Sequence, residues 1–186
     1  KDVIADFKKN TKSVRVAGGS VKGGMDHLVA ALAFQAAGEN PLKVRYVPYD
    51  AGGKAMAGLL SGDTQVLSTG FSEAVGLAKQ GEVRILAVTS EKRLPQASDT
   101  PTLKELGYDA TFANWRGFFG PPGLPEKNAV AFQQMLAKMY DTPEWEKIRT
   151  SRGWQNLYKP GKKFYTFLEK QEEVIGGLMR TLGFIK

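Results

Sequence analysis

The chain has 186 residues, 42% of them hydrophobic, and a formal net charge of +7 from 26 basic and 19 acidic residues. This length fits one large domain or two small ones, and the composition supports a buried core. The lack of cysteine and the single histidine exclude disulfides, cysteine nucleophiles and metal sites built from several thiolates or imidazoles. We therefore expect no metal site and no cofactor.

The basic residues are scattered through every segment and form no recognisable nucleic-acid module. We interpret the charge as a solvated surface with some bias towards anions, and we expect no nucleic-acid partner. The sequence contains no run of eighteen apolar residues, so it predicts no transmembrane helix. Its first residues do not have the pattern of a signal segment. Instead, the first ten residues place Val3, Ile4 and Phe7 on one face of a helix. The sequence thus begins within a predicted helix, which suggests a mature or truncated protein.

A glycine-rich loop follows the first predicted strand. Residues 13–16 are rich in valine, residues 17–24 contain four glycines, and apolar residues from Met25 onward recur at helical spacing. Glycines let the main chain approach a ligand closely, and the first turn of a helix offers unpaired N–H groups at its positive end. The loop is therefore either a small-anion site or an ordinary tight strand-to-helix turn.

Better-known loop motifs do not fit this stretch. A dinucleotide fingerprint would need glycine at Ser20, and a P-loop would need lysine and then serine or threonine after the glycine pair. The nucleophile elbow of hydrolases fails because Lys22 stands where glycine is required.

The strand, loop and helix pattern then recurs twice. The expected elements are strands at 44–48 and 65–68, glycine loops at 49–53 and 68–71, helices at 54–60 and 73–80 with Ser72 as N-cap, and a fourth, buried strand at 83–89. This alternation predicts a parallel α/β sheet flanked by helices. All three loops would then lie at the carboxyl edge of the sheet, where such folds bind ligands, and this favours the anion site.

The second half has fewer strand signals. Residues 90–102 are expected to form an exposed connection, and 103–106 one helical turn before Gly107. An aromatic, extended stretch at 111–123 precedes a helix at 125–140, a second helix that ends at Gly153, a short strand at 154–158 and a last helix at 164–182. The apolar stripe of the last helix needs a partner surface.

Several blocks of the sequence together resemble one family. They are Ala17-Gly-Gly-Ser-x-x-Gly-x-Met-Asp-His-Leu, Val44-Arg-Tyr-Val-Pro-Tyr-Asp-Ala-Gly-Gly, Leu67-Ser-Thr-Gly, Val83-Arg-Ile-Leu-Ala-Val-Thr, Thr100-Pro-Thr-Leu-Lys-Glu and Phe112-Ala-Asn-Trp-Arg-Gly-Phe-Phe. In this order they resemble the substrate-binding receptors of tripartite tricarboxylate transporters over nearly the whole chain. The tricarboxylate receptors proper are the most similar members.

The resemblance implies a two-lobed binding protein of the type II periplasmic-binding fold, and not an enzyme. Such a receptor is periplasmic, closes around a small carboxylate such as citrate, and delivers it to integral membrane subunits of the transporter. Its loops hold carboxylates mainly with main-chain N–H groups and small hydroxyls. The candidate ligand-binding residues are Gly19, Ser20, Gly23, His27, Tyr49, Ala51, Gly52, Gly53, Ser68, Thr69 and Gly70.

Structural roles compete with ligand roles at several positions. Ser20 could equally cap the helix that follows it, and His27 could simply pack in the core. Asp26 could stabilise the start of the same helix or bind a cation. Trp115 and Arg116 could border a hinge and contact the ligand, or form part of a packed aromatic segment.

Family members begin with a lobe-forming segment that has its own glycine loop, and nothing in this chain corresponds to it. The resemblance therefore implies that residues 1–114 form the second α/β lobe and that 115–186 supply a hinge strand and C-terminal helices to an incomplete first lobe. The missing N-terminal segment of the receptor would be a partner of this chain.

Two other classes of function remain as alternatives. One is an α/β hydrolase acting on a small anionic substrate, although Ser20 and His27 lie in one loop-helix segment rather than on separate loops. The other is a basic nucleic-acid-binding module.

Overall fold

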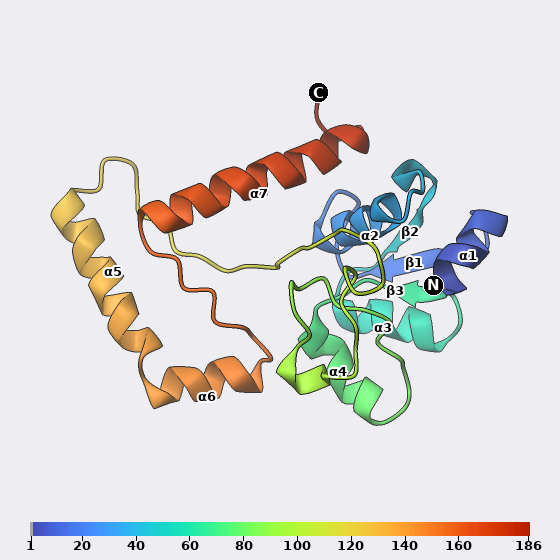
Figure 1. The fold of residues 1–186 in the computed structure, drawn as a ribbon, viewed down its shortest axis with the longest axis horizontal. Helices are drawn as coiled ribbons and strands as arrows, with labels where there is room; N and C mark the ends of the chain where they lie inside the picture. Colours follow the sequence, from blue (N-terminus) through green and yellow to red (C-terminus); the bar gives the residue numbers. More distant parts are fainter. Residues whose placement is uncertain (1) are drawn as a thin grey trace. The chain divides into compact units, whose positions relative to one another are not determined.

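A computed structural model describes residues 2–186 and confirms a mixed α/β architecture with a parallel sheet (Figure 1). The chain divides into two compact units. The first contains the residues up to Asn114 together with Val174–Lys186, and the second is Trp115–Glu173. Residues 174–186, which the sequence analysis grouped with 115–186, thus pack with the first unit. The assignment of either unit to a receptor lobe stays a prediction.

The first unit alternates strands with helices. Its elements are α1 (Asp2–Lys9), β1 (Arg15–Gly18), α2 (Met25–Ala36), the 3₁₀ helix η1 (Pro41–Lys43), β2 (Arg45–Pro48), α3 (Gly52–Leu60), β3 (Val66–Leu67), α4 (Phe71–Lys79) and the 3₁₀ helix η2 (Pro95–Ala97). The strands pair in parallel in the order β2-β1-β3, with Val16 opposite Tyr46 on one side and Val66 on the other. Because all three strands run in the same direction, the loops that follow them lie at one edge of the sheet.

The core of the first unit forms where α1 and α2 pack beside β1. The rings of Phe7 and Phe34 lie 4.6 Å apart, and Val16 is 1% exposed between the flanking strands. A second cluster joins Leu28 and Ala31 of α2 to Leu178 near the end of the last helix. The last helix therefore finds part of the partner surface that its apolar stripe requires.

The predicted strand at 83–89 is wrong, because these residues do not join the sheet. Val88 instead donates from its N–H to the carbonyl of Pro101 and accepts from the N–H of Leu103, which makes an isolated bridge to residue 102. The neighbouring segment therefore takes the backbone hydrogen bonds that the sheet would have used, and Leu86 remains 42% exposed.

The starts of two helices also differ from the predictions. The N-cap of α4 is Gly70 rather than Ser72, because the N–H of Glu73 already donates to the carbonyl of Gly70. Helix α3 begins at Gly52, so both glycines of the second loop belong to its first turn. Gly38 directly follows the C-cap of α2 and has a positive φ of +80°, which is common for the residue after the end of a helix.

The second unit contains α5 (Glu126–Tyr140), α6 (Pro143–Ser151) and the beginning of α7 (Lys162–Thr181). Pro125 is the N-cap of α5, and the Thr142 side chain caps α6 by accepting a 3.2 Å hydrogen bond from the N–H of Trp145. The predicted strand at 154–158 is wrong. Its N–H groups donate locally, that of Trp154 to Arg149 and that of Tyr158 to the Asn156 side chain, and no strand lies beside it in the described residues.

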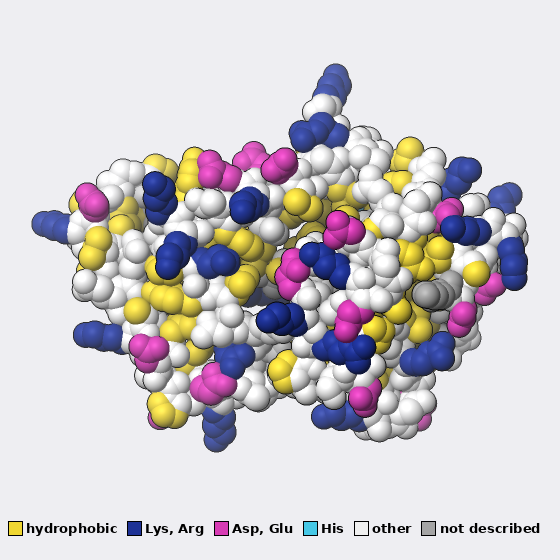
Figure 2. Space-filling model, viewed as in Figure 1, with side chains coloured by type: hydrophobic (Ala, Val, Ile, Leu, Met, Phe, Trp, Pro, Cys, Tyr) yellow, Lys and Arg dark blue, Asp and Glu magenta, His cyan; other side chains and the backbone are white. Residues whose placement is uncertain are grey.

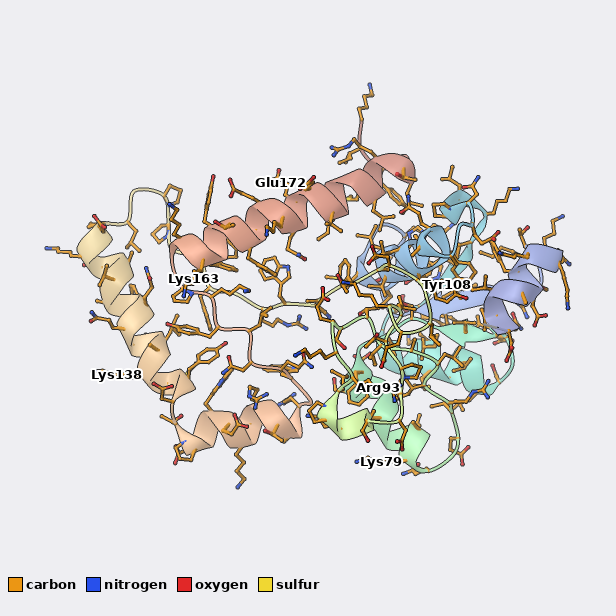
Figure 3. The ribbon with its side chains drawn as sticks, in the orientation of Figure 1. Lys79, Arg93, Tyr108, Lys138, Lys163 and Glu172 are labelled. Carbon is orange, nitrogen blue, oxygen red and sulfur yellow. The ribbon has the colours of Figure 1, made fainter. Side chains whose placement is uncertain are left out.

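None of the described residues between 115 and 173 is buried. The unit is held together by aromatic contacts, in which Trp115 meets Phe164 and Phe167 with ring centroids 5.7 and 5.8 Å apart. Hydrophobic side chains on this part of the molecule are visible at the surface in Figure 2. Lys138 on α5 and Glu172 on α7 also project from the ribbon in Figure 3.

Candidate functional site

Three strand-to-helix loops come together at the carboxyl edge of the sheet. The N–H of Tyr49 donates to the carbonyl of Gly18 over 2.8 Å, and that of Ser68 donates to the carbonyl of Ala17 over 2.9 Å. These two hydrogen bonds fix the second and third loops beside the first. The sequence predicts these three loops at one edge, and the parallel pairing of the strands confirms that arrangement.

The first and second loops touch through their main chains. A Cβ atom added to Gly19 would collide with the nitrogen of Gly52 and lie 2.6 Å from the carbonyl carbon of Ala51. Glycine is required at position 19 because the obstructing atoms belong to the backbone and cannot move independently. This close approach holds the start of α3 against the first loop.

The first loop satisfies much of its hydrogen-bonding capacity internally. The Asp26 carboxylate accepts from the N–H of Gly19 at 2.8 Å, and the Ser20 hydroxyl accepts from the N–H of Asp26 at 3.1 Å. The Tyr46 hydroxyl donates to the Ser20 carbonyl at 2.7 Å. Burial raises the pKa of Asp26 and that of Tyr46. In this conformation Ser20 and Asp26 stabilise the start of α2, and a ligand role for Ser20 stays a prediction.

His27 packs against the same loop. Its ring is 6% exposed, with its centroid 4.7 Å from that of Tyr46 and 5.8 Å, edge-on, from that of Phe184. Its Nδ1 accepts a 3.0 Å hydrogen bond from the N–H of Gly23, so the neutral ring carries its proton on Nε2. Burial, followed by the charge of Lys22, lowers the pKa of His27. The contacts are those of a core residue, and its ligand role remains a prediction.

The second loop leads into the start of α3. Ala51 is the N-cap and makes no side-chain capping bond, so Gly52 and Gly53 open the helix with N–H groups that have no intrahelical acceptor. A Cβ atom at Gly53 would meet nothing within 4 Å. Tyr49 turns away from these groups, because its hydroxyl packs against Gly58. Gly53 is thus an open main-chain position of the predicted set, whereas Gly52 is crowded by Glu73 and by Gly19.

The third loop contains Ser68, Thr69 and Gly70, and it leads into α4. The Thr69 hydroxyl donates to the carboxyl group of Glu73, which also lies against Gly52 at the start of α3. Glu73 is a residue that the sequence analysis did not include in the site. Its place in the first turn after a small-residue loop is the signal that could have identified it.

Other candidate chemistries lack the required geometry. No group of three metal-ligating side chains occurs in the part of the chain that the structure describes. The Ser20 hydroxyl contacts Tyr46 and Asp26, whereas His27 accepts from Gly23, so these contacts do not form the serine and histidine pair of a hydrolase. Trp115 packs against Phe164 and Phe167 of α7, which agrees with the prediction of a packed aromatic segment.

The distribution of charge and the character of the helices bear on two other kinds of partner, nucleic acid and a membrane. In Figure 2, lysine and arginine side chains are spread over the visible face with acidic side chains between them. Among the helices of residues 2–186, none combines the length and apolar character that crossing a bilayer requires.

Comparisons with known proteins agree with the fold. The family model described as "Tripartite tricarboxylate transporter family receptor" matches residues 1–184. A curated relative from Cupriavidus necator, the UPF0065 protein in the gbd 5' region, is 25% identical over 142 residues, which are 76% of this chain and 43% of the relative.

Two solved structures share the fold. A TctC solute binding protein from Polaromonas, solved without ligand, has a TM-score of 0.79 at 24% identity and is matched by 96% of this chain over 62% of its own length. Rpa4515 of R. palustris, solved with adipate, has a TM-score of 0.75 at 21% identity, with 98% and 60% of the two chains covered. This chain therefore spans less than two thirds of the length of these relatives.

Proposed function

Because this chain belongs to the receptor family of the tripartite tricarboxylate transporters, we propose that it is the larger part of a periplasmic receptor for a small di- or tricarboxylate. The receptor would deliver this solute to the integral membrane subunits of a transporter. The observation that carries the proposal is the convergence of three parallel strand-to-helix loops at one edge, where α3 and α4 begin. Main-chain N–H groups at helix starts are suited to carboxylates.

The geometry divides the predicted ligand residues by availability. Gly52, Gly53 and Gly70 stand at the starts of α3 and α4, whereas the N–H groups of Gly19 and Gly23 donate to side chains of α2. We expect the second and third loops to make the first contacts with a carboxylate. A contribution from Ser20 or the Gly19 N–H requires the Asp26 carboxylate to move.

The number of available donors is consistent with useful affinity. A micromolar complex needs about −8 kcal/mol, and four to six charge-assisted hydrogen bonds contribute roughly 1.5–3 kcal/mol each before the costs of association. The two helix starts supply part of that set. The remainder would come from the other lobe of the receptor.

The second unit supports the idea that this other lobe is shared with a further segment. Its described residues include no buried side chain, and the solved relatives are longer than this chain. We propose that the unit up to Asn114 is the second lobe, and that the chain from Trp115 onward completes a first lobe together with the segment that the relatives have in addition.

Amide NMR tests the site directly. Titration of the labelled chain with citrate, succinate and glucose should shift the amide signals of Gly52, Gly53 and Gly70 with the two carboxylates and leave them unchanged with glucose. Esterase turnover and retention on heparin, measured in the same buffer, address the enzyme and nucleic-acid alternatives. A response to glucose without any response to carboxylates would refute the proposal.

The divided site predicts weak binding by this chain alone. Loss of 3–4 kcal/mol of contacts weakens an affinity by several hundredfold, so citrate should bind no tighter than about millimolar. The exposed apolar side chains of α5 and α7 should also favour self-association, which light scattering detects. A monomer with micromolar affinity for citrate would instead show that the first unit binds its ligand by itself.

A further inference from the structure

Phe184, which follows the end of α7, packs against the first of the three loops. The three atoms nearest to a Cβ atom added to Gly23 all belong to the Phe184 ring, at 3.4–3.5 Å. The same ring lies edge-on to His27, with the two centroids 5.8 Å apart. Gly23 and His27 are themselves joined by the hydrogen bond from the Gly23 N–H to Nδ1. One side chain therefore covers both partners of the bond that ties the first loop to α2.

The way in which α7 ends fixes the position of this ring. The N–H of Phe184 donates to the carbonyl of Met179 at 2.9 Å, and that of Gly183 donates to the carbonyl of Arg180 at 3.0 Å. Gly183 has a φ of +75°. Two such bonds around a left-handed glycine form the Schellman motif of a helix end. Backbone hydrogen bonds thus set the place of Phe184.

Helix α7 is in turn attached to the helix that carries His27. Leu178 is 4% exposed and packs with Leu28 and Ala31 of α2. The residues from Val174 onward belong to the first unit. The contacts of Leu178 therefore begin at the residue next to His27, and α2 holds both the loop and the segment that covers it.

The first loop also supports the start of α3. The backbone at Gly19 lies so close to that of Gly52 that a Cβ atom on Gly19 would collide with the Gly52 nitrogen. Gly53, in the same first turn of α3, is the open main-chain position. A loop that must become ordered when a ligand binds lowers the affinity by the cost of that ordering, whereas a loop already held in place does not.

We infer that Phe184 is a positioning residue of the binding site: it holds Gly23 and His27, and through the first loop it keeps the start of α3 in place. The inference rests on the proposed function, because it concerns the same three loops. It adds to that function a role in binding for a residue that follows the last helix and is far along the chain from every loop.

NMR of the 186-residue chain measures this hold without any ligand. In the unmodified chain, the Gly23 amide should be protected from hydrogen exchange, and the Phe184 ring should give a nuclear Overhauser effect to Gly23. His27 should titrate below pH 6.5, because burial lowers its pKa. Phe184→Ala should accelerate exchange at Gly23 by about tenfold or more and should move the pKa of His27 back towards 6.5.

The other titratable groups near His27 stay the same in every variant. They are Lys22 of the first loop, whose charge also lowers the pKa of His27, Asp26 beside it on α2, and Tyr46 of β2, whose ring lies 4.7 Å away. A change in the titration of His27 therefore reports on its burial. A side chain that contributed only general stability would leave this titration unchanged.

Succinate is the probe for binding, followed by the amide signal of Gly53. Phe184→Ala should weaken succinate binding by about threefold or more. Phe184→Leu keeps a large apolar side chain and should recover most of the exchange protection, the titration and the affinity. Ile185→Ala is the matched control, since Ile185 and Phe184 are both 42% exposed, and it should change none of the three.

The outcomes separate the inference from the proposed function. Unaltered exchange at Gly23 and unaltered titration of His27 in Phe184→Ala would overturn the inference, and so would equal changes in Ile185→Ala. A loosened loop with full succinate affinity would overturn the role in binding. If Phe184→Ala does not fold, the absence of the Overhauser effect in the unmodified chain, or full loss of protection in Phe184→Leu, would overturn the hold. If no carboxylate shifted any signal of the unmodified chain, the proposed function itself would fail.

Discussion

The two units of this chain differ in how they use their hydrophobic residues. The first unit buries Phe7, Val16 and Ala17 almost completely, each at 1% exposure or less. The second also contains amphipathic helices, but its described side chains include none that is buried, and Phe118 and Phe132 are 77% and 55% exposed. Amphipathic helices form in both units, whereas a core forms only where a sheet is available to receive them.

This difference indicates which of the two units has a core of its own. In the first unit, β1 pairs on both sides and α1 and α2 pack beside it. In the second, aromatic contacts between partly exposed rings, such as that of Tyr140 with Tyr158, whose centroids lie 4.5 Å apart, take the place of a buried core. We therefore expect the first unit to carry most of the measurable stability.

Core truncation should give the largest contrast between the units. Phe7→Ala removes a fully buried ring that packs on Phe34, and it should lower the free energy of unfolding by about 3–5 kcal/mol. Phe132→Ala removes an exposed ring in the second unit and should change it by about 0.5 kcal/mol or less. Urea denaturation measures both. Equal losses would show that the second unit has a core of comparable importance.

Glycine substitution should give the next largest effect. Gly19→Ala forces the first two loops apart, because the obstruction is backbone, and should cost about 1–3 kcal/mol. Gly117→Ala in the second unit meets the tip of the Phe164 side chain, which can move aside by a small change in χ1, so its cost should be smaller. Gly53→Ala is the control. The sequence predicts the same ligand role for Gly53 as for Gly19, but the structure leaves open space at Gly53, and this substitution should not destabilise the fold by crowding.

Titration of His27 should give a smaller effect, confined to the first unit. Burial lowers its pKa from 6.5 in the folded state, so the unfolded chain binds the proton more readily. The stabilisation that neutral His27 provides is complete above the unfolded-state pKa and is lost as the pH falls through the lower, folded-state pKa.

The stability of the unmodified chain should therefore fall more steeply below about pH 6.5 than that of His27→Asn. Asparagine retains an acceptor for the N–H of Gly23 but does not titrate. Urea titrations across this pH range measure the two slopes, and identical slopes would show that His27 is not the group responsible.

The smallest effect is expected at the surface. Lys54→Ala removes the ion pair with Asp50, whose side chains are 66% and 86% exposed, and should change the free energy of unfolding by less than about 1 kcal/mol. A thermal melt at low and high salt measures this change. A larger loss would mean that surface charges, as well as buried apolar area, contribute to the difference in stability between the two units.

Much of the local structure followed from the sequence. Glycine loops after β-branched runs marked the ends of β1, β2 and β3, and apolar spacing located α1, α2 and α5 to within a few residues. The loops that form the candidate site were also found this way, because a parallel sheet places the carboxyl ends of its strands at one edge. Such signals are local, and so one sequence suffices to detect them.

The partners of each segment depended on the tertiary structure. The run at 83–89 has the composition of a buried strand, yet its backbone hydrogen bonds join it to Pro101, Leu103 and Phe112. Ser20 and His27 had the chemistry of ligand residues, but their hydrogen bonds go to Asp26 and Gly23, while Glu73 gained its place in the site through contact with Gly52. Composition sets what a segment can bind, and only the fold determines which groups come within reach.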